Sequence, residues 1–239
     1  MKELEDHAGF PSFLRNYQTE FIGFVVSTFN MYDAFILYLK TAVRPNLVMN
    51  DLCSGSGEPA ITIFKKSNYF TQLILSDVYP NPIRINDKRV FYEMKSKDVL
   101  TMEFEREACY TMFNSFHHFT NEQKRTITNK IQSVGAEAFI VEILEPTVFC
   151  FLKVLLATTL GCILLTPFVK PFSFKRLFFT YIFPVNIFTI MFDGLLSTVK
   201  SSTAEQYKKL FTEYNSLVEV VRLTGSLSPL TVIKIRQPK

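Results

Sequence analysis

Residues 47–57 read Leu-Val-Met-Asn-Asp-Leu-Cys-Ser-Gly-Ser-Gly, and this stretch decides the fold class. A short apolar run ends at Asp51 and passes into the turn Gly55-Ser56-Gly57, and Pro59 follows where a helix can begin. Glycine lets the backbone approach a ligand closely, and proline suits the first turn of a helix, where its missing N–H costs nothing. A strand, a glycine turn and a helix in this order indicate a nucleotide-sized ligand at the edge of a parallel sheet.

The same stretch also fits the dinucleotide pattern Gly-x-Gly-x-x-Ala through Gly55, Gly57 and Ala60, so it does not by itself identify the ligand. The segments that follow have to decide whether the ligand is a dinucleotide. Residues 72–76 read as a second strand followed by Asp77, and Asp98-Val99 comes one unit further along. Residues 110–119 read as a fourth strand that runs into a polar, aromatic loop, whose candidate site residues are Asn114, Ser115, His117 and His118.

This series resembles the class I S-adenosylmethionine-dependent methyltransferases. Their first motif is acidic-x-Gly-x-Gly-x-Gly, which appears here as Asp51-Leu-Cys53-Ser-Gly55-Ser-Gly57, with Cys53 in place of the first glycine. An acidic residue after the second strand, an Asp-aliphatic pair after the third and an Asn-x-x-His-His-type loop after the fourth are also typical. The resemblance covers residues 45–145 and implies an α/β, Rossmann-like, mostly parallel sheet with an antiparallel last strand.

The resemblance also implies S-adenosyl-L-methionine as the cofactor and gives roles to individual residues. Asp51 is expected near its methionine end, Asp77 at the ribose hydroxyls, and Asp98 and Val99 around the adenine. Gly55 and Gly57 provide the close approach of the backbone. The remaining cofactor-binding candidates are Cys53, Ser54, Asn114 and Ser115. An aspartate that ends a strand can instead cap the next helix.

His117 and His118 are the catalytic candidates, because imidazole titrates near neutral pH and can take a proton from an acceptor. The alternative is that one of them only orders the loop. Glu142, at the end of the strand predicted over 138–143, points towards the same cleft. Asp193 either reaches the mouth of the substrate site or caps a turn with Gly194.

The chain divides into three parts. An N-terminal helical cap spans 1–45, with a helical apolar pattern over 10–42 that either covers the cofactor or packs on the sheet. The Rossmann-like core spans 46–146 and 193–239, and an apolar helical insertion occupies 147–192. Within the core the sequence predicts a helix over 121–134, a capping box at Ser202–Glu205 and a terminal pair of strands over 217–223 and 230–235.

The insertion has two apolar runs, 148–166 and 177–192, of which the second is broken by Pro184. Between them Lys170, Lys175 and Arg176 form a basic corner. Three interpretations compete: a membrane span, a hairpin that lies in a membrane interface, and a lid over an apolar substrate pocket or a homodimer face. The last two both imply a hydrophobic partner.

The composition restricts the function further. The chain has 239 residues, 48% of them hydrophobic, with 25 Phe and no Trp. A net charge of +4 without a basic run argues against nucleic acid as a partner. The four cysteines lack metal-ligand spacing, so we expect reduced thiols and no metal site. The acidic N-terminus is unlike a secretory signal, which favours a cytoplasmic protein, peripheral at the inner face of the membrane if the insertion contacts lipid.

The sequence therefore predicts a methyltransferase that acts on a hydrophobic small molecule or a lipid-like acceptor. The alternatives are a non-catalytic, membrane-associated assembly protein that retains the fold, and a dinucleotide-dependent reductase. Binding of S-adenosylmethionine or of NAD would separate them, because a ligand of the native state raises its melting temperature.

Overall fold

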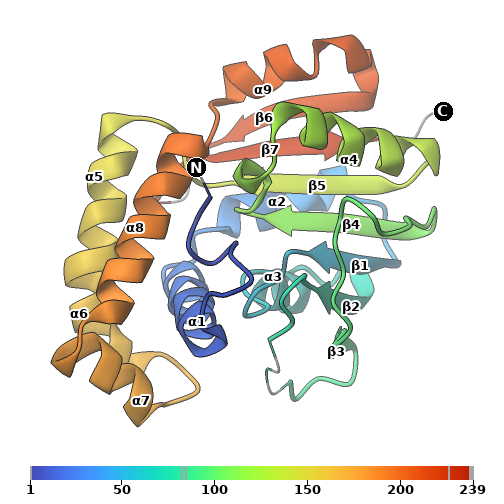
Figure 1. Cartoon of the computed structure of the whole chain (residues 1–239). Helices are drawn as coiled ribbons and strands as arrows, with labels where there is room; N and C mark the ends of the chain where they lie inside the picture. The colour runs from blue at the N-terminus through green and yellow to red at the C-terminus, as the bar shows by residue number, and fades with distance from the viewer. Residues whose placement is uncertain (1, 82, 84, 226, 237–239) are drawn as a thin grey trace.

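The computed structural model describes residues 2–81, 83, 85–225 and 227–236. Within these residues seven strands form one sheet in the order β3-β2-β1-β4-β5-β7-β6 (Figure 1). The strands are β1 Leu47–Leu52, β2 Phe70–Ser76, β3 Val90–Tyr92, β4 Ala108–Phe113, β5 Glu137–Glu142, β6 Val218–Leu223 and β7 Leu230–Ile235. Strands β1 to β5 pair in parallel, whereas β7 pairs antiparallel with both β5 and β6. The predicted Rossmann-like, mostly parallel sheet with an antiparallel last strand is confirmed.

Helices cover both faces of this sheet because its central strands are apolar on both sides. Every residue of β4, β5 and β7 is buried. Side chains such as Phe139 and Val232 pack against α2 (Asp33–Ala42) and α3 (Ala60–Ser67). Their chain neighbours Ile140 and Ile233 point to the opposite face and pack with residues of α4 (Asn121–Ser133) and α9 (Ala204–Leu210).

The helical pattern predicted over 10–42 is confirmed for most of its length, but it is divided between two helices. The chain forms α1 (Ser12–Thr28) and α2, which meet at an angle of 75°. The break falls at residues 29–32, where Asn30 adopts a left-handed φ of 50°. Helix α2 packs on the sheet, as one of the two alternatives predicted, whereas α1 lies over the glycine turn.

The insertion forms an outer layer of helices at one side of the sheet (Figure 1). Helix α5 (Val148–Leu156), the π-helical turn η2 (Ala157–Gly161), α6 (Cys162–Leu165) and the 3-10 turn η3 (Thr166–Phe168) follow one another directly. The chain then returns through α7 (Phe174–Leu177), the π-helical turn η4 (Phe178–Ile182) and α8 (Val185–Lys200). A small apolar cluster of Phe21, Cys162, Val169 and Ile190 joins this layer to α1.

Helix α8 runs through the predicted boundary between residues 192 and 193, so the alternative in which Asp193 caps a turn with Gly194 is wrong. Its buried side chains, Asn186, Thr189, Ile190, Asp193 and Ser197, recur at helical spacing. Polar residues occupy much of this buried stripe. A prediction from apolar residues alone therefore ends this segment before the helix itself ends. At the chain ends, residue 1 of the predicted cap and residues 237–239 of the predicted core lie outside the described residues.

Several smaller boundaries shift by one residue. The capping box of α9 uses Thr203 and Gln206 instead of Ser202 and Glu205. Strand β5 begins at Glu137, β6 begins at Val218, and α4 ends at Ser133. Short 3-10 turns follow β4 and α9: η1 (Phe116–His118) and η5 (Thr212–Leu217). None of these shifts moves a candidate site residue to another element.

Candidate cofactor and acceptor site

A cavity of about 1180 Å³ opens at the carboxyl ends of β1, β2 and β4, between the sheet, α1 and α8. Polar groups from separate strand ends face it, as the predicted order of motifs requires. The predicted site residues that line the cavity are Cys53, Ser54, Gly55, Asp77, Asp98, Val99, Asn114, Ser115, His117 and His118. Asp51 and Gly57 lie behind these lining residues.

The glycine turn has the backbone conformation that its sequence indicates. Cys53, Gly55 and Gly57 have φ values of 57°, 50° and 83°, in the left-handed region. This region suits glycine, so Cys53 occupies a position at which a side chain is strained. A Cβ on Gly57 would lie 2.9 Å from Cδ1 of Leu75, so this glycine is required by packing behind the cavity.

Helix α1 approaches this turn closely enough to depend on a glycine of its own. A Cβ on Gly23 would lie 2.5 Å from Oγ of Ser56, and that hydroxyl donates a hydrogen bond to the Thr19 carbonyl over 2.9 Å. The contact at Gly23 could not be predicted from the sequence, because an isolated glycine inside a helical pattern carries no signal of what packs against it. Helix α1 is thus fastened to the turn as a cover.

The two aspartates of the first two strands have different surroundings. Asp77 accepts hydrogen bonds from the backbone N–H groups of Gly55 and Tyr79, each over 2.8 Å, and still lines the cavity. A carboxylate offers about four lone-pair positions, so Asp77 retains the capacity to bind hydroxyl groups. Asp51 accepts from the Thr111 hydroxyl over 2.7 Å and is buried, and this burial raises the pKa of its carboxyl to about 7.

Asp98 accepts a hydrogen bond from the Leu100 backbone N–H over 2.9 Å, so it does begin a turn, as the capping alternative proposed. It nevertheless lines the cavity beside Val99, which is buried. Asn114 has a left-handed φ of 48°, and it lines the cavity together with Ser115 at the end of β4. The four strand-end motifs therefore lie around one space.

His117 and His118 follow β4 in the 3-10 turn η1, with their rings stacked at a centroid distance of 4.6 Å. Nδ1 of His117 lies 2.7 Å from Oε2 of Glu142, whose other oxygen accepts from the Phe116 backbone N–H. Burial alone would raise the pKa of the Glu142 carboxyl, but His117 outweighs it and the pKa is lowered. Glu142 thus orients His117 as an anionic partner.

His118 is surrounded by carboxylates of the N-terminal segment. Its Nδ1 lies 3.0 Å from Oδ1 of Asp6, and its Nε2 lies 3.5 Å from Oε2 of Glu3. Burial opposes the charged ring, yet Asp6, Glu3 and Glu5 together raise the pKa of His118 to about 9. In the chain alone His118 is therefore a cation near neutral pH.

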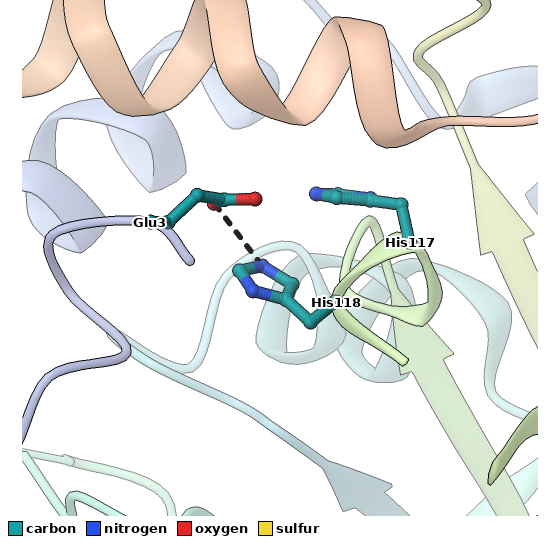
Figure 2. A group of neighbouring side chains, drawn as sticks. All are labelled: Glu3, His117 and His118. Atoms are coloured by element: carbon teal, nitrogen blue, oxygen red, sulfur yellow. Dashed lines mark ion pairs between the residues drawn. The ribbon is translucent and has the colours of Figure 1, made fainter. Parts of the chain in front are cut away.

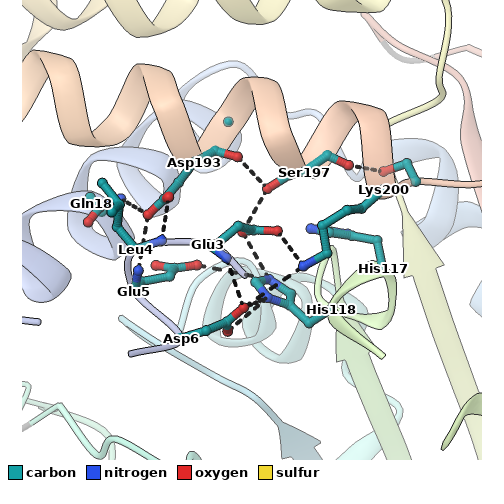
Figure 3. Close-up of polar contacts among 12 residues, drawn as sticks. Glu3, Leu4, Glu5, Asp6, Gln18, His117, His118, Asp193, Ser197 and Lys200 are labelled. Carbon is teal, nitrogen blue, oxygen red and sulfur yellow. Dashed lines mark hydrogen bonds and ion pairs between the residues drawn. The ribbon is translucent and has the colours of Figure 1, made fainter. Parts of the chain in front are cut away.

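The N-terminal segment is held in this place by α8 (Figure 3). Asp193 accepts from the backbone N–H groups of Leu4 and Glu5 over 2.6 and 3.1 Å. Glu3 accepts from Ser197 and pairs with Lys200, each over 2.9 Å. Asp193 is therefore an anchor for the segment. No local sequence pattern indicates this network, because its members come from opposite ends of the chain and show no periodicity.

No protein-family model matches the sequence, and no curated protein matches it significantly. Solved structures do match the fold. The O-methyltransferase family 2 protein of Planctomyces limnophilus, in complex with apigenin, is 13% identical with a TM-score of 0.53 over 93% of this chain and 62% of its own. The mitomycin 7-O-methyltransferase MmcR is 13% identical with a TM-score of 0.52 over 90% of this chain and 54% of its own.

A third structure, an S-adenosylmethionine-dependent methyltransferase of Aquifex aeolicus, is 9% identical with a TM-score of 0.51. It matches 88% of this chain and 93% of its own. The chain therefore has the fold of the class I S-adenosylmethionine-dependent methyltransferases, which confirms the fold prediction. The first two structures are longer proteins, and this chain spans only 62% and 54% of their respective lengths.

Proposed function

We propose that the chain binds S-adenosyl-L-methionine in the cavity and transfers its methyl group to a small acceptor. The observation that carries this proposal is the convergence of the glycine turn, Asp77, the Asp98-Val99 pair and the Asn114 loop on one cavity in a methyltransferase fold. The antiparallel β7 disfavours the dinucleotide alternative. A non-catalytic assembly protein has no requirement for all four motifs at one cavity.

Ligand binding tests this proposal directly. S-adenosylmethionine and S-adenosylhomocysteine should each raise the melting temperature of the protein, whereas NAD should leave it unchanged, since only a ligand of the native state stabilises it. A shift with NAD alone would contradict the proposal and favour the reductase. No shift with any of the three ligands would favour the assembly protein.

The acceptor that we propose is hydrophobic. The cavity wall also includes Phe21, Ile22, Val25 and Ile190, contributed by α1 and α8. Such a wall favours an apolar body, and His117 lines the same cavity as the group that could take a proton from an acceptor hydroxyl. In this role His117 would position and deprotonate the nucleophile, and the sulfonium of the cofactor would supply the methyl group.

The histidines are tested by their unequal effects. His117→Ala should lower kcat by about 100-fold, within the range of general-base catalysis, and leave S-adenosylmethionine affinity nearly unchanged. His118→Ala should affect turnover less, because His118 is already engaged with Asp6. Full turnover in both variants would remove the pair from the mechanism and leave a site that only positions its two substrates.

We also propose that the insertion contacts a membrane surface, which would place the protein at the cytoplasmic face of a membrane. One helical segment, residues 148–168, is long and apolar enough to cross a bilayer, and two bent helix pairs would also pass that test if each counted as one span. Only 11% of the apolar window in 148–168 is buried. Exposed apolar surface of this kind requires a cover of lipid, ligand or protein.

A further inference from the structure

Three side chains bring possible metal ligands together beside the cavity. One ligand atom each of Glu3, His117 and His118 lies within 4.8 Å of the other two. Figure 2 shows the His117 ring pointing towards the Glu3 carboxylate, with His118 on the adjacent side. Two imidazoles and one carboxylate form a set that binds Zn²⁺ and other divalent transition metals.

Both rings are held in the orientation that metal-binding histidines adopt. Nδ1 of His117 is engaged by Glu142 at 2.7 Å, and Nδ1 of His118 is engaged by Asp6 at 3.0 Å. A carboxylate on one ring nitrogen fixes the ring and increases the basicity of the other nitrogen, which then faces the metal. This arrangement leaves Nε2 of His117 without a partner and directs Nε2 of His118 towards Glu3 and Glu5.

Nε2 of His117 is the second, independent sign of a ligand. The side chain is 2% exposed, and this atom has no hydrogen-bond partner among the described residues. A buried polar atom without a partner costs free energy, so its retention points to a group that binds there. Glu3, which the ring faces, is itself 1% exposed.

Distance and charge fit a divalent cation. Nε2 of His118 lies 3.5 Å from Oε2 of Glu3, whereas ligands bound tetrahedrally at about 2.1 Å would lie about 3.4 Å apart. The carboxylates around the position belong to Glu3, Glu5, Asp6, Glu142 and Asp193, and the ammonium groups near them belong to Lys124 and Lys200. Lys200 and Ser197 use part of the Glu3 carboxylate, which keeps further lone pairs for a metal.

We propose that Glu3, His117 and His118 bind a divalent transition-metal ion at the acceptor end of the cavity. Three protein ligands would leave one position of a tetrahedral ion open, and all three residues line the cavity. An ion there would take over from His117 the role of promoting loss of a proton from an acceptor hydroxyl. The site does not depend on methyl transfer, so metal binding and cofactor binding can succeed or fail separately.

Calorimetric titration of the chelator-treated full chain with Zn²⁺ tests the site. The wild type should bind one equivalent, and His117→Ala, His118→Ala and Glu3→Gln should each weaken binding by about tenfold or more. His7→Ala is the matched control, because His7 is exposed and should leave the affinity unchanged. Thermal shifts with S-adenosylmethionine on the same samples report whether each variant is folded.

Glu3→Gln keeps the test decisive if removal of a buried histidine prevents folding, since Glu3 lies on the N-terminal segment outside the sheet. The proposal is overturned if the wild type binds no Zn²⁺, or if His7→Ala weakens binding as much as Glu3→Gln does. A wild type that shifts with S-adenosylmethionine but binds no metal would overturn the metal site and leave the proposed function standing. The converse result would overturn only the methyltransferase proposal.

Discussion

At the scale of single residues, Asp77 connects the glycine turn to the proposed ribose site. Its carboxylate binds the Gly55 N–H and faces the cavity, so Asp77→Ala removes both a support of the turn and the partner of the ribose hydroxyls. A charge-assisted hydrogen bond contributes about 1.5–3 kcal/mol, which corresponds to a loss of about 10- to 150-fold in S-adenosylmethionine affinity. Isothermal titration calorimetry measures this loss directly.

The matched control for Asp77 is Asp87→Ala. Asp87 belongs to the segment that leads into β3 and pairs with Arg89, and it does not line the cavity. Its replacement should leave cofactor affinity unchanged. Equal affinities of wild type and Asp77→Ala would refute the assignment of the ribose site.

Asp51 gives a prediction about pH. Because its folded pKa is about 7 and its ordinary value is 3.8, the folded chain keeps a proton that the unfolded chain has lost between these values. The free energy of unfolding therefore falls as pH rises from about 4 to about 7. Above that range the loss of stability caused by the ionised Asp51 is constant. Asp51→Asn retains an acceptor for Thr111 without the charge, so its stability relative to wild type should increase over the same range.

Urea unfolding of wild type and Asp51→Asn at several pH values measures this difference. Comparison of the two proteins cancels the contribution of carboxyl groups that do not interact with Asp51 and whose pKa values burial raises, such as Glu5 and Asp193. A stability difference that does not change with pH would mean that Asp51 is ionised in the folded chain throughout. In that case the methionine end of the site would carry a fixed negative charge before the cofactor binds.

At the scale of elements, the cover formed by α1 depends on Gly23. A methyl group there would meet Ser56 and Glu58, so Gly23→Ala should push α1 away from the glycine turn. We expect a loss of about 1–3 kcal/mol in stability, as is usual for overpacking, together with weaker cofactor binding. Gly161→Ala is the control, because a Cβ on Gly161 would lie 3.7 Å from its nearest neighbour and alanine favours a helix. If both variants melt alike, α1 is not held at Gly23.

The parts of the fold that the sequence predicts are those encoded by neighbours in the chain. Short local patterns of alternation, capping and glycine positions indicate the glycine turn after β1, the aspartates at the strand ends, α4 and β7. The break between α1 and α2 does not, because Asn30 adopts its left-handed φ within an otherwise helical apolar pattern.

The site itself was predicted only in part for the same reason. The proposed cofactor residues follow their strands and could be located by motif. The contacts of Glu3, Asp6 and Lys200 join the two ends of the chain, and no local pattern encodes them. Arg176 shows the same limit: it was predicted as part of a basic corner with Lys170 and Lys175, but it is 1% exposed and pairs with Glu20 of α1. For Arg176 that prediction is wrong, because its acidic partner lies far away in the sequence.

At the scale of the whole molecule, the insertion concentrates the exposed apolar surface on one side. Phe174 is 81% exposed and Val148 78%, and many other large apolar side chains of this layer are also open to solvent. Lys170 and Lys175 remain exposed beside them, at the tip where Phe172 and Phe174 protrude. Apolar side chains flanked by cations suit an anionic membrane surface, where each cation contributes about 1 kcal/mol.

The wild type should therefore co-sediment with anionic vesicles. Reversal of both charges in Lys170→Glu/Lys175→Glu should weaken binding by about tenfold or more. Phe172→Asp/Phe174→Asp should weaken it on neutral vesicles as well, because it removes the apolar contact.

Leu37→Asp is the control: Leu37 is 73% exposed on α2, outside the insertion, and its replacement should change nothing. Arg176 is left intact, since its reversal would break the buried pair with Glu20. A wild type that stays in the supernatant and runs without detergent as a monomer would make the insertion a lid over the cavity. A detergent-independent dimer would instead make it a subunit interface, and in either case the membrane proposal would fail while the hydrophobic acceptor could still hold.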